Sequence, residues 1–392
     1  MSHYNTILSQ LLVHVPRHHF EKLAESYECQ RYVKSLSSWS QFTTLLYAQA
    51  SSKDSLRDIQ NALAAQEPKL YHLGLPNRIC RSTLSDANAK RPWVLYQSIF
   101  YKLLERCQAV APRHKFPFKS PLITLDSTLI DLCLGLFPWA KFSKIRGGLK
   151  LHYQFDHAGQ IPTFLTVTEK RGCRVSHDLS VAQRHLVPQP DSIYCFDRGY
   201  YSFPWFRRIH QAGAFFVTRP RKGLRYVITG QHKQTENTAV LADRPIQLTG
   251  VHPSKAFPGS LRLVRYYDAK TARTFEFLTN HFALSALTIA EIYKARWQIE
   301  AFFKWIKQNL KIKSFLGTSR NAVLTQIWVA MCYYLLLSYI KFQSKYRFSL
   351  FYLHRIIKAT LLERFSLIDL LSLTERRLPH IRDGDPQLSW AF

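Results

Sequence analysis

The spacing of hydrophobic and polar positions changes along the chain. Up to about Cys107 the apolar residues recur at helical spacing, with turn residues between the periodic segments. From Leu122 the period becomes two, and residues 149–156 alternate apolar and polar side chains, which is typical of a strand with one polar face. Helical spacing returns around residues 292–310 and again from Ala322 onward. The pattern therefore predicts a mixed α/β (α+β) chain with helices at both ends and a sheet in the middle.

The middle of the chain shows an ordered succession of short elements. The predicted strands are 122–126, 149–156, 161–168, 193–196 and 214–218, and the predicted helices are 177–185 and 203–212. Residues 219–280 show no helical period and contain short β-like runs at 226–229, 261–267 and 274–278, which we interpret as a β-rich insertion. We predict three regions: an all-helical N-terminal domain (1–115), an α/β domain (116–320) interrupted by the insertion at about 219–280, and a helical C-terminal region (321–392).

One predicted helix carries an unusual polar face. At about 100° of rotation per residue, four polar residues fall within an arc of about 60°: Tyr293, Arg296, Glu300 and Lys307. The apolar positions lie on a different arc and are Ile292, Ile299, Phe302, Ile306 and Leu310. A solvated face with a Glu300–Lys304 pair is the ordinary alternative. A single acid surrounded by cations and a tyrosine instead favours an anionic ligand that brings metal.

Composition and charge indicate a polyanionic partner. The 392 residues carry a formal net charge of +28, and 46% of them are hydrophobic, which is enough to form proper cores. Nucleic acid is the leading candidate partner, because the basic residues are not gathered on one amphipathic helix that would lie on a membrane. The seven cysteines include no C-x-x-C pair and are expected to be reduced core thiols.

Membrane insertion and export are not expected. The most apolar run, 327–340, is shorter than the ~20 residues needed to cross a bilayer, so we predict a buried helix there. The apolar patch near the N-terminus is too short, and too interrupted by histidine and arginine, for a secretory signal. We therefore expect a cytoplasmic protein that is associated with the nucleoid when it is bound to DNA.

Two aspartates follow short buried runs. Asp126 follows an apolar run in the string DST, and Asp197 follows Ile193–Phe196 and opens the string DRGY. Transfer of a phosphodiester commonly uses two divalent ions about 3.5 to 4 Å apart, and magnesium prefers oxygen ligands. Together with Glu300, the two aspartates would supply such ligands from three separate elements. A lone aspartate at a strand end is more often a turn or cap residue. The competing acids are Asp131, Asp156, Glu169, Asp178 and Asp191, and we keep only Asp178, as a supporting residue.

The motif spacing resembles a known family. The string Tyr-x2-Arg-x3-Glu-x6-Lys and the string DRGY are similar to the signature of bacterial insertion-sequence family 4 transposases. The resemblance implies a ribonuclease H-like catalytic domain with a β-rich insertion, and a DDE triad of Asp126, Asp197 and Glu300 that holds two Mg²⁺ (or Mn²⁺) ions. It further implies cut-and-paste transposition by metal-dependent phosphodiester hydrolysis and strand transfer. The implied partners are double-stranded DNA with terminal inverted repeats, target DNA and a second copy of the chain in a synaptic dimer, with the N-terminal region holding the transposon ends.

The remaining residues of the signature are candidates for contacts with DNA. Arginine and lysine neutralise phosphate charge, a tyrosine hydroxyl donates to phosphate oxygen, and an aromatic ring stacks on a base. The predicted DNA-binding residues are Tyr293, Arg296, Lys307, Arg198, Trp297 and Lys304. Two basic clusters are predicted to follow the DNA backbone, or else to form a solvated surface: Lys141, Lys144, Arg146 and Lys150, and Arg219, Arg221, Lys222 and Arg225.

One departure from the family concerns the insertion. Better-known relatives cut through a DNA hairpin and hold a flipped base with a tryptophan of the insertion, whereas residues 219–280 contain no tryptophan. Tyr266, Tyr267 and Phe257 are the aromatic residues that we consider as substitutes. Two other functions stay open on the sequence alone: a nuclease of the same fold that cleaves without joining, and a non-enzymatic DNA-binding protein.

Overall fold

A long β-sheet forms the centre of the computed structural model, which describes residues 5–31, 33–141, 147–169, 177–230, 239–312 and 314–377. Its first five strands are β1 (Leu122–Leu132), β2 (Gly147–Asp156), β3 (Ile161–Glu169), β4 (Ile193–Phe196) and β5 (Phe215–Thr218). They are arranged in the order β3-β2-β1-β4-β5, and β1, β4 and β5 run parallel while β2 and β3 run antiparallel to their neighbours. This order confirms the predicted ribonuclease H-like fold.

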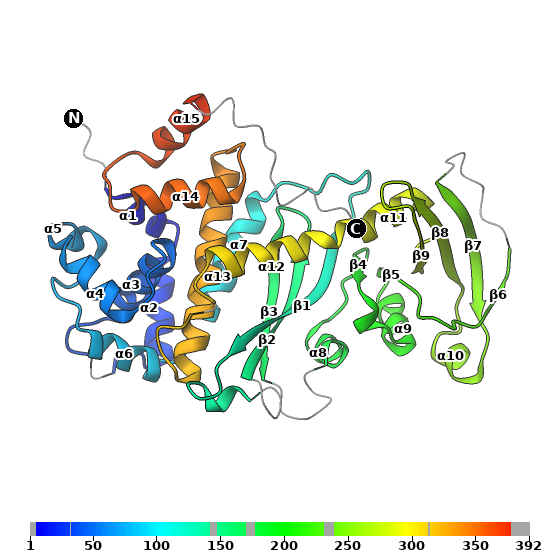
Figure 1. Cartoon of the computed structure of the whole chain (residues 1–392), viewed down its shortest axis with the longest axis horizontal. Coiled ribbons are helices and arrows are strands. Elements are labelled where there is room, and N and C mark those ends of the chain that lie inside the picture. The colour runs from blue at the N-terminus through cyan, green and yellow to red at the C-terminus, as the bar shows by residue number, and fades with distance from the viewer. Residues whose placement is uncertain are drawn as a thin grey trace.

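Helices cover both faces of this five-stranded part. The two faces are covered by α8 (Asp178–His185) and α9 (Phe203–Gln211), and by α11 (Ala286–Ala295) and α12 (Trp297–Asn309) (Figure 1). Alternation along β1 decides which residues meet which layer. Ile123 and Leu125 pack in one cluster with α9, whereas Leu122 packs with α11. Asp126 has the same parity as Leu122 and therefore lies on the face that α11 and α12 cover.

The insertion continues the same sheet. Its strands are β6 (Tyr226–Ile228), β7 (Val240–Leu248), β8 (Leu261–Asp268) and β9 (Arg273–Thr279). Strand β9 pairs antiparallel with β5, so that the described residues form one nine-stranded sheet. Asn280 strengthens this junction, because its side-chain oxygen accepts a hydrogen bond of 2.8 Å from the backbone N–H of Phe216. The β-rich insertion is confirmed.

Two elements of the insertion were not predicted. The helix α10 (Val251–Ala256) has only six residues, too few to establish a helical period, so the expectation of no helix between 219 and 280 is wrong at this point. Strand β7 was missed because Pro245 lies within it, and proline within a strand pattern argues against a strand. Pairing with β8 on one side and the short β6 on the other nevertheless holds β7 in place.

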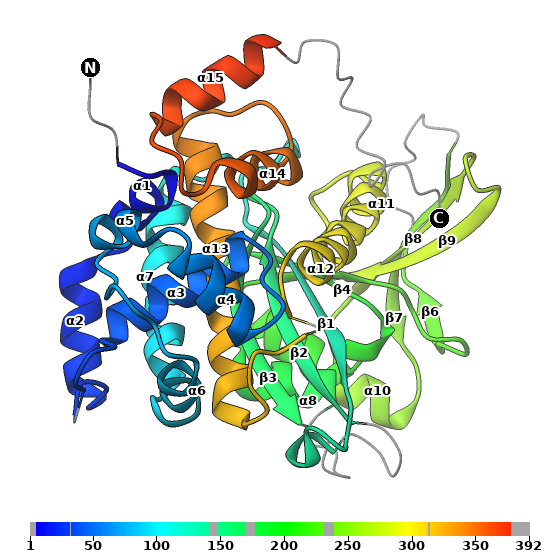
Figure 2. The same cartoon turned by 60° about the vertical axis from the view of Figure 1, so that its left-hand side comes forward.

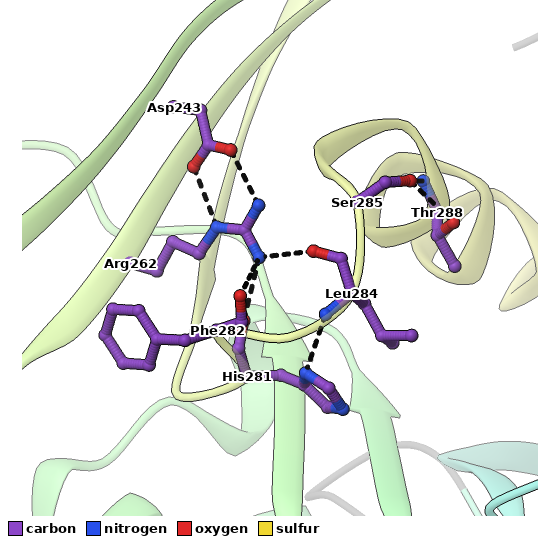
Figure 3. Close-up of polar contacts among 7 residues, drawn as sticks. All are labelled: Asp243, Arg262, His281, Phe282, Leu284, Ser285 and Thr288. Atoms are coloured by element: carbon purple, nitrogen blue, oxygen red, sulfur yellow. Dashed lines mark hydrogen bonds and ion pairs between the residues drawn. The ribbon is translucent and has the colours of Figure 1, made fainter. Parts of the chain in front are cut away.

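A buried arginine fixes the segment that leads from the sheet into α11. Arg262 on β8 is 1% exposed and makes two hydrogen bonds to the carboxylate of Asp243 on β7, at 2.7 and 2.6 Å. Its remaining nitrogen donates to the carbonyl oxygens of His281, Phe282 and Leu284 (Figure 3). One side chain therefore joins two strands of the insertion to the start of the helix pair that crosses the catalytic sheet.

The N- and C-terminal helices share one hydrophobic core with β1, β2, β3 and α12. The N-terminal helices are α1 (Ile7–Val13), α2 (Arg17–Ser26), α3 (Ser38–Ala50), α4 (Leu56–Ala64), α5 (Glu67–Leu70), α6 (Arg81–Lys90) and α7 (Val94–Val110). The C-terminal helices are α13 (Arg320–Gln343), α14 (Leu350–Thr360) and α15 (Leu367–Arg377). Figure 2 shows α13 running among α3, α6 and α7. The three-region division at residues 115 and 320 stays a prediction.

Among the described residues, helix α13 is the one helix that is long and apolar enough to cross a membrane by length and composition. It has 24 residues, and 94% of its most hydrophobic window is buried inside the protein. The predicted buried helix at 327–340 is confirmed, although it begins and ends further out than the apolar run. Its length would suffice to cross a bilayer, but its burial is that of a core helix and does not indicate a membrane.

The cysteines only partly match their prediction. Four of the six described cysteines are buried, whereas Cys80 and Cys133 are exposed, so the expectation that all are core thiols is wrong for these two. Cys80 immediately precedes α6, and Cys133 immediately follows β1, where the chain leaves the core.

Candidate active site

Two of the three predicted acids follow the last pair of two neighbouring parallel strands. Leu125 of β1 pairs with Phe196 of β4, and Asp126 and Asp197 are the residues that come directly after this pair. Asp126 is not at the end of its strand as predicted, because β1 continues to Leu132 in antiparallel pairing with β2. The pairing of β1 with β4 is what ends at Leu125.

Backbone N–H groups orient both aspartates. The N–H of Ser127 donates to Oδ1 of Asp126, and the N–H of Gly199 donates to Oδ1 of Asp197, each at 2.8 Å. A Cβ atom at Gly199 would lie 2.9 Å from that same Oδ1 of Asp197, closer than such atoms normally approach. The glycine of the DRGY string therefore allows the carboxylate of Asp197 to keep its place.

The third acid does not lie on one continuous helix with Tyr293. The predicted single helix is divided at Arg296 into α11 and α12. At this point the hydrogen bonds span three residues, from the N–H of Arg296 to the carbonyl of Tyr293 and from the N–H of Ile299 to the carbonyl of Arg296. The prediction of one unbroken helix is wrong because such a tighter turn leaves no trace in a pattern of apolar spacing. The five apolar residues of the predicted buried arc are nevertheless all buried.

Arg296 links two of the acids. Its guanidinium nitrogens lie 3.4 Å from Oδ2 of Asp126 and 3.1 Å from Oε1 of Glu300, and its side chain is 9% exposed. The rings of Tyr293 and Trp297 flank the same guanidinium, with centroids 5.6 and 5.4 Å from its central carbon. The structure therefore brings Asp126, Asp197, Arg296 and Glu300 into one cluster.

The cluster changes the acidity of Asp126. Burial raises the pKa of its carboxyl to about 7, and the neighbouring charges of Asp197 and Glu300 act in the same direction. The N–H of Ser127 and the guanidinium of Arg296 oppose this shift. Both other acids are thus close enough to Asp126 to act on its charge.

The carboxylates suit a divalent metal ion in kind. Oxygen ligands from several elements are what magnesium and manganese take in proteins. Among the described residues, however, no three His, Cys, Asp or Glu side chains are grouped closely enough to hold one ion together. Glu300 is instead paired with Arg296. The cluster therefore suits a divalent ion in its donor chemistry, while Asp126 and Glu300 are paired with Arg296 in this structure.

The candidate DNA contacts are distributed around this cluster. Trp297 is 48% exposed, whereas Tyr293 is 8% exposed and packs against Phe277. Lys304 is exposed and Lys307 is half-buried, one and two turns beyond Glu300 on α12. Arg198 is exposed and directly follows Asp197.

The two predicted basic clusters differ in what the structure shows. Lys144 and Arg146 lie outside the described residues, while Lys150 pairs with Asp178 at 2.8 Å. In the second cluster Arg219 lies over the ring of Phe275 and Arg221 lies over the ring of Tyr201. Lys222 and Arg225 are exposed.

One of the three aromatic residues considered as substitutes for a tryptophan faces the cluster. A cavity of about 290 Å³ lies between the insertion and the α11–α12 junction, and Tyr266 lines it together with Arg219, Arg296 and Trp297. Phe257 is 1% exposed and belongs to the core. Tyr267 is 39% exposed and is not part of the cavity wall. Tyr266 is thus the residue of this set that remains a candidate for contact with a base.

Asp178 lies in a polar cluster formed by β1, β2 and α8. Its carboxylate contacts Nζ of Lys150 at 2.8 Å and Nδ1 of His152 at 3.2 Å, and His152 pairs across the strands with Ser127. Burial alone would raise the pKa of Asp178, but the side chains of His152, Lys150 and Ser127 outweigh it and hold this pKa well below its usual range. Asp178 thus supports the residue that follows Asp126, which agrees in position with its predicted supporting role.

We expect Asp178→Asn to destabilise the protein in a pH-dependent way. Because the folded-state pKa is lowered, the carboxylate stabilises the fold above its ordinary pKa of about 3.9, and this stabilisation declines as the pH falls below it. At pH 7 the loss should be about 2 kcal/mol, the value of a hydrogen bond to a charged group. Denaturant unfolding at pH 7 and near pH 3 measures it, with exposed Asp191→Asn as the control. An equal difference from the native protein at both pH values would contradict this prediction.

Sequence reasoning missed a chain of hydrogen-bonded side chains that passes through His157. The imidazole of His157 bonds Oγ1 of Thr124 at 2.7 Å and Oε1 of Gln298 at 3.0 Å. Burial lowers the pKa of His157 to about 4, so the ring is neutral near pH 7. This hydrogen-bonded chain connects Thr124 of β1, two residues before Asp126, with Gln298 of α12, two residues before Glu300. No local signal could have revealed it, because its members are far apart in the sequence.

The fold and the site together define a class of enzyme. The sheet order β3-β2-β1-β4-β5, with Asp126 on β1, Asp197 directly after β4 and Glu300 on α12, is the arrangement of a ribonuclease H-like DDE enzyme. Residues 117–336 match the family described as transposase DDE domain, and residues 3–76 match a domain of unknown function (DUF4372). The chain belongs to the transposase DDE domain family and is a DNA transposase of the DDE type.

Curated relatives agree with this membership. The chain is 34% identical over 258 residues to a putative transposase (y4zB) of Sinorhizobium fredii, a match that covers 65% of this chain and 69% of that protein. It is 30% identical over 285 residues to a probable transposase for the insertion sequence element IS5377 of Geobacillus stearothermophilus, covering 69% and 70% of the two chains. A putative transposase for the element IS4SA of Synechocystis is 32% identical over 278 residues, covering 65% and 70%.

A solved structure was also matched. It is the cryo-EM structure of the piggyBac transposase synaptic complex with hairpin DNA, at a TM-score of 0.45 and 12% sequence identity. The match covers 98% of this chain and 84% of that chain. This similarity is too low to add to the assignment, which rests on the family match and the strand order.

Proposed function

We propose that this transposase moves an insertion sequence by cut and paste, and that Asp126, Asp197 and Glu300 are its catalytic residues. The observation that carries the proposal is that Arg296 pairs with both Asp126 and Glu300, while Asp197 directly follows the strand that pairs with the strand of Asp126. The Tyr-Arg-Glu-Lys spacing supports placement in insertion-sequence family 4, as does the occurrence of insertion-sequence transposases among the relatives.

The three acids would hold two Mg²⁺ (or Mn²⁺) ions. When bound, such ions lower the pKa of an attacking water and stabilise the charge on the leaving oxygen. The chain's own residues prepare the site for them. Backbone N–H groups of Ser127 and Gly199 orient the two aspartates, and Arg296 balances the negative charge of Asp126 and Glu300. The buried face of α12 and the hydrogen-bonded chain through His157 keep Glu300 over β1.

The proposed DNA contacts lie close to the acids along the chain. Trp297, Lys304 and Arg198 are exposed near the acids, and Lys307 continues the row along α12. Tyr293 and Arg296 are more buried, so we propose that they meet only the phosphate group at the cleavage point. The excess of 54 lysine and arginine over 26 acidic residues supports extended contact with a polyanion, which weakens as salt rises.

The proposed partners follow from cut-and-paste transfer. The substrates are double-stranded DNA ending in terminal inverted repeats and a target DNA, brought together by a homodimer in a synaptic complex. We propose that residues 1–115 hold the transposon ends and that the protein acts in the cytoplasm at the nucleoid. Since the family membership concerns the DDE domain, each of these partners needs its own measurement.

A strand-transfer assay tests the proposal against a nuclease of the same fold. Purified protein is incubated with precut element ends bearing a free 3′ hydroxyl, a target plasmid and Mg²⁺. We expect covalent joining of the ends to the plasmid, detected as labelled product on a denaturing gel, with ends that lack the 3′ hydroxyl as the control. Cleavage of uncut ends without any joined product would favour the nuclease. Tight binding of the ends with neither reaction would favour a non-enzymatic DNA-binding protein.

A further inference from the structure

A second and larger cavity lies outside the acid cluster. It has a volume of about 800 Å³ and is bounded by residues 112–117, α12, α13 and the segment that leads into α14. Such a volume is within the usual range of small-molecule sites. None of the catalytic or DNA-contact residues proposed above lines it.

The floor of this cavity is aromatic. Buried rings form it, and half-buried rings stand at its sides: Phe155, Phe302, Trp305 and Tyr334, and Phe116, Phe342 and Phe351. Flat apolar surfaces of this kind favour a ligand with a planar ring.

Three residues of the cavity wall contain a buried polar atom without a partner. The indole nitrogen of Trp305, the hydroxyl of Ser349 and Nδ1 of His114 are buried and make no hydrogen bond within the described part of the chain. Trp305 as a whole is only 6% exposed. Buried polar groups are normally satisfied, and an indole N–H can only donate. These atoms have almost no accessible surface, so the rings and the charges of the wall, and not these atoms, indicate the kind of ligand.

The rim of the cavity is cationic. Arg113, Lys115, Lys341 and Arg347 line it, against a single acid, Glu291. Arg113, Lys115 and Arg347 are exposed, and Nζ of Lys341 is held at the wall by a hydrogen bond of 2.6 Å to the carbonyl of Phe348. The cavity therefore combines an aromatic floor with a positive rim.

We propose that this cavity binds one unpaired nucleotide, with the base on the aromatic floor and the phosphate at the cationic rim. A free phosphate would leave the floor unfilled, and a purely apolar ligand would leave the cationic rim without a counter-charge. The same chemistry is offered by a free nucleoside monophosphate and by an unpaired nucleotide of a DNA strand.

The position of the cavity favours the DNA strand. His157 and Gln298 line the cavity and also form the hydrogen-bonded chain to Thr124. Thr124 precedes Asp126 by two residues on the same face of β1, a distance of about 7 Å along a strand. A strand that passes the acids can therefore place a neighbouring nucleotide in the cavity.

Photocrosslinking and calorimetry test the site without relying on catalysis. The full chain carrying Glu300→Gln is mixed, in the absence of divalent metal, with 5-iododeoxyuridine monophosphate, with a single-stranded pentamer ending in the same nucleotide, or with the blunt duplex of the pentamer. We expect saturable binding of the first two probes and a crosslink to a peptide containing Phe302 or Trp305. Tighter binding of the pentamer assigns the site to a DNA strand, and equal binding assigns it to a free nucleotide.

Matched variants locate the binding. Arg113→Gln combined with Arg347→Gln should weaken nucleotide binding about tenfold, the effect of losing one charged hydrogen bond. Trp305→Phe should weaken it several-fold while keeping the aromatic floor. The controls are Arg364→Gln, an exposed arginine elsewhere, and Trp328→Phe, whose indole nitrogen also has no partner in the described residues but lies in the core.

The proposal is overturned by any of three results: no saturable binding, a crosslink to another region, or unchanged affinity in the double arginine variant. If Trp305→Phe fails to fold, the arginine variant decides, because both of its substitutions are on exposed side chains. The measurement contains no cleavage step, so failure of the catalytic assignment would appear separately, in the strand-transfer assay.

Discussion

Asp126→Asn, Asp197→Asn and Glu300→Gln should each abolish magnesium-dependent cleavage of a supercoiled plasmid that carries the ends of the element. Each substitution keeps the size of the side chain and removes the charge that a divalent ion requires. Stabilisation by the ions amounts to several kcal/mol, so we expect the cleavage rate to fall about a thousandfold or more. Binding of labelled ends, measured by gel shift, should persist in all three variants.

Asp131→Asn is the matched control for this experiment. Asp131 is an exposed acid on the same strand as Asp126, five residues further along, and was one of the competing candidates. It should cleave at the native rate. Retained cutting by any one of the three acid variants would remove that residue from the triad, and loss of both cutting and end binding would indicate a folding defect instead.

Arg262→Ala should unfold the protein at markedly lower denaturant concentration. The substitution takes the guanidinium away from the buried carboxylate of Asp243 and from three carbonyl oxygens at the entrance to α11 (Figure 3). Removing one partner of a buried ion pair typically costs about 3 to 5 kcal/mol. Chemical denaturation followed by circular dichroism measures the change in the free energy of unfolding.

Two further variants separate the ion pair from other effects. Arg265→Ala removes an exposed arginine from the same strand and should change stability by less than about 0.5 kcal/mol. Arg262→Met combined with Asp243→Leu replaces the pair by apolar side chains and should recover part of the loss, because no charge is then left buried. A loss in Arg262→Ala no larger than that in Arg265→Ala would show that the buried contacts do not hold the insertion.

The sequence was most informative where one period extended over a whole element. Residues 149–156 alternate clearly, and the structure has β2 at 147–156. Predictions from periodicity were wrong where an element contained a feature that the apolar pattern does not record. Pro245 concealed β7, and the three-residue turn at Arg296 divided a helix whose apolar spacing looked continuous. Local patterns contain no information on such details, since they depend on what packs against the element.

The sequence singled out the three acids but not their connections, and their catalytic role stays a prediction. Asp126, Asp197 and Glu300 each lie in a recognisable string, and the pairing of β1 with β4 and the guanidinium of Arg296 bring them near one another. The bridging position of Arg296, and the chain from Thr124 through His157 to Gln298, join residues that are distant along the chain. Their partners become known only when the fold is known.

The pairing of β9 with β5 has a mechanical consequence. Strand β9 of the insertion is hydrogen-bonded to β5, so the insertion belongs to the same sheet as β1 and β4. It is therefore a rigid extension of that sheet and not a separate flap on flexible linkers. Hydrogen bonds of Asn280 and Arg262 stabilise the place where the insertion joins the rest of the sheet. A ligand bound to the insertion therefore has a fixed position relative to the acids. A shift of one strand by one residue would move this ligand by about 3.3 Å.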